Sequence, residues 1–141
     1  PLGSAAACVR LNDLVPADSR NLSPPQKAFF KPSARFDMSK YLKTASSAID
    51  ISDGLVQDLN HILESSCCGA SLESKLIPLG DSAELEDGLF GGDDYELIFT
   101  SSEDLRSLDK IGQLTRELGI RVDGEAITPR GFDHFLNEPE S

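Results

Sequence analysis

The chain has 141 residues, of which 39% are hydrophobic and 26% charged, and its formal net charge is −11. This length suits one compact domain, the composition excludes a disordered or fibrous chain, and the lack of a run of about 18 apolar residues excludes a membrane span. The negative charge disfavours nucleic acid and anionic membranes as partners. Three cysteines, two of them adjacent, form no disulfide framework and favour a reducing, cytoplasmic location.

The first part of the sequence is expected to contribute little to the folded core. Residues 1–4, Pro-Leu-Gly-Ser, resemble the remnant that a protease leaves after it removes a purification tag, so we expect them to lie outside the fold. Four prolines within residues 16–35 predict an extended chain with few ladder hydrogen bonds. We therefore expect an extended basic arm over residues 5–36, followed by a single domain over residues 37–141.

Charge is distributed unevenly along the chain. Residues 1–49 have a net charge of +4, from seven basic and three acidic residues, whereas residues 50–141 have a net charge of −15, from six basic and 21 acidic residues. The simpler interpretation is that the arm packs against the acidic domain and neutralises part of its charge. The alternative is that the acidic part binds hard cations such as Mg²⁺, which prefer oxygen ligands.

Apolar spacing predicts a helix, a strand and a longer helix in the first half of the domain. A short helix is expected over residues 37–45 and a buried strand over residues 47–52. The longer helix begins at Gly54 and ends before Gly69, because glycine favours the left-handed conformation that follows a helix. The apolar positions of this helix are Leu55, Leu59, Ile62 and Leu63.

The second half of the domain is expected to mix strands and helices. The first elements are a strand over residues 70–77, a polar connection with one helical turn over residues 79–88, and a strand over residues 95–100. Ser102 opens a helix-capping pattern, residues 111–116 fit a helix or a strand equally, and Asp123-Gly124 predicts a hairpin turn. The sequence therefore predicts an α+β fold, in which helices pack on a mixed, largely antiparallel sheet.

Three polar residues, Asp50, Ser52 and Asp53, stand where the predicted strand becomes the longer helix. One interpretation is that Ser52 or Asp53 caps the helix by accepting a backbone N–H group. The other is that Asp50 and Asp53 bind Mg²⁺ while the Ser52 hydroxyl and backbone N–H groups bind a phosphate. Capping leaves Asp50 unexplained, because this residue lies at the end of a strand.

Two further motifs contain groups that could bind a ligand. The run Gly91-Gly92-Asp93-Asp94 is either a turn whose acids face water or a close approach of the backbone to a ligand, with Asp93 or Asp94 meeting a cationic or donating group. Near the C-terminus, Phe132 follows a glycine and could stack on a flat ring.

Taken in order, these motifs resemble the C-terminal domain of thiamine-monophosphate kinase. The resemblance covers about residues 45–135 and runs through AIDISDGLVQDLNHI, GASLESKLIPL, GGDDYELIFT, IGQLT and GFDHF. The wider superfamily includes aminoimidazole-ribonucleotide synthetase, whose C-terminal domain has the fold class expected here. The pairing of GGDDYEL with a terminal GFDHF resembles the thiamine branch of that superfamily.

The resemblance implies a function and a set of site residues. A parent protein of this family transfers the γ-phosphoryl group of ATP to thiamine monophosphate with Mg²⁺, and is a homodimer. By motif position, Asp50 and Asp53 would bind Mg²⁺, and Ser52 would contact the ATP phosphates. Asp93 and Phe132 would contact thiamine monophosphate.

The sequence departs from the family pattern in ways that affect activity. Asp93 stands where the family usually has glutamate, and two connections, residues 78–91 and 101–110, look shorter than usual. The N-terminal ATP-binding domain of the family, which carries further Mg²⁺ ligands and the dimer interface, is absent from this chain. We therefore expect the chain alone to be inactive. The alternatives are another kinase or synthetase of the superfamily, or a non-catalytic acidic domain that binds a protein.

Overall fold

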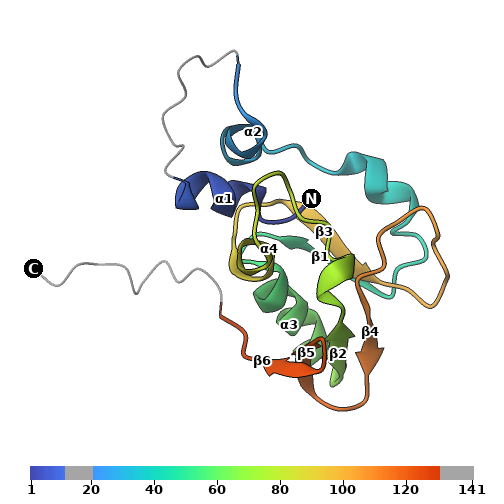
Figure 1. The fold of residues 1–141 in the computed structure, drawn as a ribbon. Helices are drawn as coiled ribbons and strands as arrows, with labels where there is room; N and C mark the ends of the chain where they lie inside the picture. Colours follow the sequence, from blue (N-terminus) through green and yellow to red (C-terminus); the bar gives the residue numbers. More distant parts are fainter. Residues whose placement is uncertain (12–20, 131–141) are drawn as a thin grey trace, which may run out of the picture.

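The computed structural model describes residues 1–11 and 21–130, and its helices and strands intermingle along the chain (Figure 1). Within these residues, no helix is long and apolar enough to cross a bilayer. The elements are α1 (Ser4–Arg10), α2 (Pro24–Phe30), η1 (Phe36–Lys40), β1 (Ser47–Ile51), α3 (Leu55–Ser66), β2 (Gly69–Leu72), η2 (Ser74–Leu76), α4 (Leu85–Phe90), β3 (Glu96–Thr100), β4 (Gly112–Thr115), β5 (Gly119–Val122) and β6 (Glu125–Ile127).

The strands form two sheets. β1 and β3 are an antiparallel pair in which Ser47 lies opposite Thr100 and Ile51 lies opposite Glu96. The other sheet has the strand order β4-β2-β5-β6, and its β2–β5 pair is parallel whereas its outer pairs are antiparallel. These pairings confirm the predicted α+β fold with a mixed, largely antiparallel sheet.

Helix α3 is the element around which the core is built. It contacts β1 in the two-stranded sheet and β5 in the four-stranded sheet, so one helix covers both (Figure 1). Leu55 and Val56 in its first turn are fully buried, and Leu63 near its end is 2% exposed. Burial of each such side chain contributes about 1.5–3 kcal/mol. The predicted helical spacing is therefore confirmed.

The expectation that residues 1–4 lie outside the fold is wrong. Leu2 is 4% exposed and belongs to the same apolar cluster as α3. Its N–H group donates to the Pro78 carbonyl at 2.7 Å, and its carbonyl accepts from the N–H group of Gly80 at 2.9 Å. Ser4 begins α1. The burial of the Leu2 side chain and the two backbone hydrogen bonds of this residue hold the start of the chain against the core.

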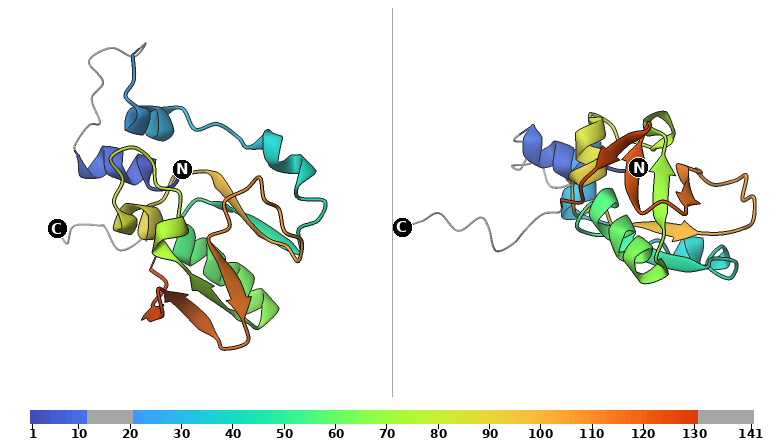
Figure 2. Two further views of the ribbon diagram at one scale, coloured as in Figure 1. Left: turned by 45° about the vertical axis from the view of Figure 1, so that its right-hand side comes forward. Right: turned by 90° about the horizontal axis from the view of Figure 1, so that it is seen from below.

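The extended arm predicted over residues 5–36 is also partly wrong, because it contains α1 and α2, which lie side by side (Figure 2). Pro24 and Pro25 occupy the first two positions of α2, where a missing N–H group costs no helical hydrogen bond. Ser23 and Gln26 form a reciprocal capping box. The prolines therefore start a helix rather than extend the chain.

Other predictions differ in detail. The helix predicted over residues 37–45 is the shorter 3-10 helix η1, and the strand predicted over residues 70–77 ends at Leu72, where η2 follows. The helix predicted from Ser102 is absent, since the described chain between β3 and β4 forms bends and turns. The ambiguous segment 111–116 contains the strand β4. The hairpin turn at Asp123-Gly124 is confirmed, with both residues at positive φ.

Helix α3 ends differently from the prediction. Cys67, with a φ of 50°, takes the left-handed conformation, while Gly69 already belongs to β2. Gly69 is required for another reason, because a Cβ atom there would overlap the carbonyl oxygen of Glu117. Sheet packing rather than helix capping therefore explains this glycine.

We expect Gly69→Ala to lower the free energy of unfolding by about 3 kcal/mol, because the backbone that it would meet cannot move without breaking β2 pairing. Gly124→Ala is the control. Nothing lies within 4 Å of a Cβ atom at Gly124, and its φ of 88° costs an alanine only about 1 kcal/mol. Urea unfolding followed by circular dichroism measures both, and equal losses would contradict the assignment.

Candidate functional site

The turn between β1 and α3 carries the three polar residues that the sequence singles out. Asp50 is exposed near the end of β1, and Ser52 and Asp53 are half-buried in the turn. Gly54, with a φ of 111°, is the N-cap residue of α3, and no side chain caps this helix at that position. The interpretation of Ser52 or Asp53 as the helix cap is therefore wrong.

A residue that the sequence reasoning missed holds this turn. Asp58, in the first turn of α3, is 2% exposed, and its Oδ2 accepts the N–H groups of Ser52 at 2.8 Å and Asp53 at 2.9 Å. These two N–H groups are consequently not available to a phosphate, which corrects part of the sequence-based hypothesis. The sequence signal that could have identified Asp58 is an acidic residue on the buried, otherwise apolar face of this helix.

The Gly91–Tyr95 loop lies directly against this turn. The N–H group of Asp93 donates to the Ser52 carbonyl at 2.9 Å, and that of Tyr95 donates to the Ile51 carbonyl at 2.8 Å. A Cβ atom on Gly92 would approach the Ser52 carbonyl oxygen to 2.6 Å, so a side chain there would push the loop away. The fold thus brings together the first two of the three sequence motifs.

The acids of the turn and the loop share one electrostatic environment. The Tyr95 hydroxyl donates to Asp93 Oδ1 at 3.2 Å, and this hydrogen bond, with the charge of Asp93, raises the pKa of Tyr95. Asp50 and Asp53 contribute further to the same shift in pKa. The Tyr95 hydroxyl therefore lies in the negative field of Asp93, to which Asp50 and Asp53 add smaller contributions.

The donor set suits a hard cation. Aspartate oxygens are ligands that Mg²⁺ prefers, and Asp50 near the end of β1 and Asp53 in the following turn supply two of them. Across residues 1–11 and 21–130, no group of three or more His, Cys, Asp or Glu side chains is placed to hold a metal ion. The two aspartates thus fit part of a Mg²⁺ coordination shell, and phosphate oxygens or water fit the rest.

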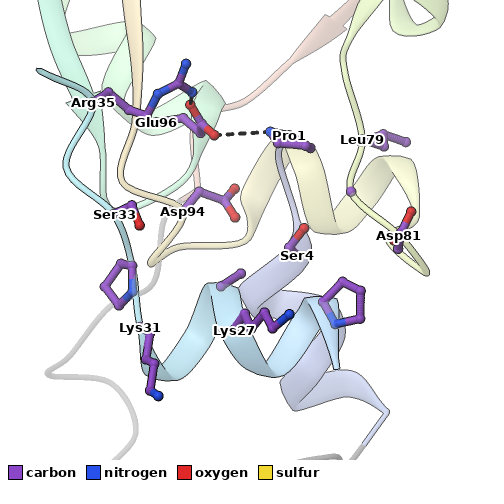
Figure 3. A pocket seen from close by; sticks show the side chains of 14 residues that line it. Pro1, Ser4, Lys27, Lys31, Ser33, Arg35, Leu79, Asp81, Asp94 and Glu96 are labelled. Carbon is purple, nitrogen blue, oxygen red and sulfur yellow. Dashed lines mark hydrogen bonds and ion pairs between the residues drawn. The ribbon is translucent and has the colours of Figure 1, made fainter. Parts of the chain in front are cut away.

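Asp94 has a different partner from Asp93. It lines a cavity of about 430 Å³ between α2 and residues 79–81, together with Glu96, which pairs with Arg35 (Figure 3). The Gly3 N–H group donates to Asp94 Oδ2 at 2.7 Å, while Oδ1 is buried without a partner among the described residues. Burial raises the pKa of Asp94 to about 6. Asp94 therefore joins the loop to the start of α1.

The remaining predicted site residue cannot be placed. Phe132, in the third motif, lies outside the described residues. Its contact with thiamine monophosphate stays a prediction.

Comparison with known proteins identifies relatives of about twice this length. No family model matches the chain. Thiamine-monophosphate kinase of Aquifex aeolicus is 34% identical over 120 residues, which cover 74% of this chain and 39% of that protein. The same enzyme of Escherichia coli K12 is 36% identical over 159 aligned residues, which cover 94% of this chain and 49% of that protein. The chain therefore spans at most about half the length of these curated relatives.

Solved structures agree with the sequence relatives. AaThiL complexed with AMPPCP and TMP matches with a TM-score of 0.81 and 31% identity, over 95% of this chain and 48% of that one. Thiamine-monophosphate kinase from Stenotrophomonas maltophilia K279a matches with a TM-score of 0.76 and 32% identity, over 89% of this chain and 48% of that one. The α+β fold described above is thus shared with half of each of these proteins.

The raised pKa of Asp94 predicts a pH dependence of stability. Because the folded-state pKa, about 6, lies above the usual value of 3.8, the folded chain binds a proton more tightly than the unfolded chain, and its stability falls as the pH rises towards 6. Asp94→Asn keeps an acceptor for Gly3 without the charge. We expect this variant to be more stable than wild type at pH 7.5, by about 1–2 kcal/mol after allowance for solvent screening.

Urea unfolding between pH 4 and pH 7.5 measures this effect. The advantage of Asp94→Asn should shrink between pH 6 and pH 4, as the wild-type carboxyl takes up its proton. Asp104→Asn is the matched control, since Asp104 is an exposed carboxylate that pairs with Arg106. A difference in the free energy of unfolding between Asp94→Asn and wild type that does not change with pH would contradict the prediction.

Proposed function

Because the chain belongs to the thiamine-monophosphate kinase family by sequence and by fold, we propose that it is the substrate-side part of an enzyme that phosphorylates thiamine monophosphate to thiamine diphosphate with ATP and Mg²⁺. In this proposal, the chain is a C-terminal domain, and an N-terminal ATP-binding domain of a cytoplasmic, homodimeric parent completes the enzyme. The chain spans about half the length of its curated relatives, which is consistent with this division.

One observation carries the proposal. The backbone of Ser52 joins the two motifs, because its carbonyl accepts the N–H group of Asp93 while its own N–H group is held by Asp58. This arrangement joins the segment of Asp50 and Asp53 to the segment of Asp93 through backbone hydrogen bonds. A site that must hold a cation beside two phosphate-bearing substrates needs carboxylates from separate segments at fixed positions.

The proposed reaction requires the protein to position the two substrates, and no residue forms a covalent intermediate. A terminal phosphate oxygen of thiamine monophosphate attacks the γ-phosphorus of ATP, the bond from that phosphorus to the bridging oxygen breaks, and ADP leaves. When bound, Mg²⁺ offsets the negative charge of the phosphates. Asp50 and Asp53 would hold this ion, and the Ser52 hydroxyl would orient a phosphate of ATP. The similar structure complexed with AMPPCP and TMP supports this pair of ligands.

Asp93 is proposed as the residue that contacts thiamine monophosphate. Its carboxylate accepts from the Tyr95 hydroxyl at 3.2 Å, which limits the positions that this shorter side chain can take. Its φ of 63° places it in the left-handed region, where a residue other than glycine is uncommon. The backbone N–H group of Asp93 contacts the turn, whereas Asp94 lines the cavity beside α2.

We expect the chain alone to form no ADP that depends on thiamine monophosphate, because Asp50 and Asp53 supply only part of the ligands that a Mg²⁺–triphosphate complex needs. A coupled ADP assay with ATP, Mg²⁺ and thiamine monophosphate measures this. Thiamine-monophosphate-dependent ADP formation, in a preparation free of contaminating kinase, would contradict the proposed division of the site.

We expect Asp53→Asn to leave the fold unchanged and to weaken Mg²⁺ binding about tenfold. The Asp53 side chain makes no hydrogen bond in the described residues, and the N–H group that Asp58 holds is kept by asparagine. Titration with Mg²⁺ and thiamine diphosphate, followed by amide chemical shifts, measures the affinity. Asp104→Asn is again the control, and equal affinities in both variants would remove Asp53 from the metal site.

A further inference from the structure

Asp58 is buried in the first turn of α3 and accepts the backbone N–H groups of Ser52 and Asp53. We propose that Asp58 is a positioning residue, which holds the Ser52–Asp53 backbone so that the aspartates of the turn and the loop meet one metal-bound ligand. This inference rests on the proposed function and adds a residue that the family motif positions did not include.

The burial of Asp58 needs an explanation. A carboxylate that is 2% exposed is costly in the core unless hydrogen bonds satisfy it. Its Oδ2 accepts two consecutive backbone N–H groups, at 2.8 and 2.9 Å. Hydrogen bonds to an ionised acceptor are about twice as strong as neutral ones. The carboxylate therefore holds the turn from inside the protein, through two backbone hydrogen bonds.

The two contacts fix the backbone beside Asp53, one of the two proposed metal-binding residues. The N–H groups of Ser52 and Asp53 belong to successive peptide planes, and both planes turn towards one oxygen. Because the peptide unit is planar, this convergence sets the backbone dihedral angles of Ser52. The Cα atom of Asp53, from which its side chain projects, is therefore held in place.

The same contact reaches the loop. The Ser52 carbonyl accepts from the N–H group of Asp93 at 2.9 Å, so a turn that moves carries the loop with it. Gly92 lies against the Ser52 carbonyl with no space for a side chain. Loss of the Asp58 contact should therefore disturb Asp93 as well as Asp53.

The competing explanation is that Asp58 only stabilises the fold. Leu63→Ala is the control for this explanation. Leu63 is 2% exposed and lies on the same helix, about one and a half turns beyond Asp58 and away from the turn. Its truncation removes core packing and leaves the Ser52 and Asp53 contacts intact. A variant of this kind loses stability without a specific effect on metal binding.

The experiment compares wild type, Asp58→Ala, Asp58→Asn and Leu63→Ala at a temperature where all four are folded. Amide hydrogen exchange at Ser52 and Asp53 measures the contact, and titration with Mg²⁺ alone, followed by amide chemical shifts, measures the site. In Asp58→Ala we expect exchange at least tenfold faster and a Mg²⁺ dissociation constant at least fivefold higher. Asp58→Asn, whose carboxamide oxygen can accept both N–H groups, should restore most of the affinity, and Leu63→Ala should match wild type.

The outcomes separate this inference from the proposed function. If Asp58→Ala keeps the wild-type Mg²⁺ affinity while the Ser52 and Asp53 amides exchange faster, the positioning role is overturned. Asp58 would then only stabilise the turn. Amides that stay protected in Asp58→Ala would overturn the contact itself. A wild-type chain with no Mg²⁺-dependent shifts would contradict the proposed metal site. In that case, protection in wild type and Asp58→Asn but not in Asp58→Ala would still support Asp58 as the residue that holds the turn.

Discussion

Two backbone N–H groups in the turn after β1 converge on one buried carboxylate oxygen of Asp58, and the geometry of the candidate site depends on this contact. Neither Ser52 nor Asp53 is the N-cap residue of α3, which is Gly54. With Asp58 in place, Ser52 and Asp53 keep their side chains for other partners. The carboxylate that satisfies these two N–H groups is thus supplied by the protein itself.

The position of Asp58 depends in turn on the core. Asp58 follows Leu55 and Val56, which are fully buried between the two sheets, so the first turn of α3 cannot rotate without exposing them. Rotation of an apolar pair of this size out of the core would cost several kcal/mol. The hydrophobic packing of α3 therefore fixes the direction of a polar group that never reaches the surface.

The sequence predicted the strand, turn and helix around residues 47–66, because their apolar spacing is local and strong. It did not predict α2, since Pro24 and Pro25 are read as breakers unless the capping box at Ser23 is recognised. The helix expected from Ser102 failed for the opposite reason: a local capping pattern had no core contact to stabilise it. For the site, the motifs named the acids, whereas Asp58 emerged only once its burial and its backbone partners were known.

The Gly91–Tyr95 loop shows why residue type alone could not assign roles to its two aspartates. Positive φ angles at Asp93 and Tyr95 depart from strand geometry, so the regular alternation of a strand does not predict the partners of Asp93 and Asp94. Asp93 pairs through its backbone with the turn, and Asp94 accepts from Gly3 at the start of α1. The loop is therefore fixed from both sides. Residues 1–4, which looked dispensable in the sequence, position the back of the loop whose front carries the proposed substrate contact.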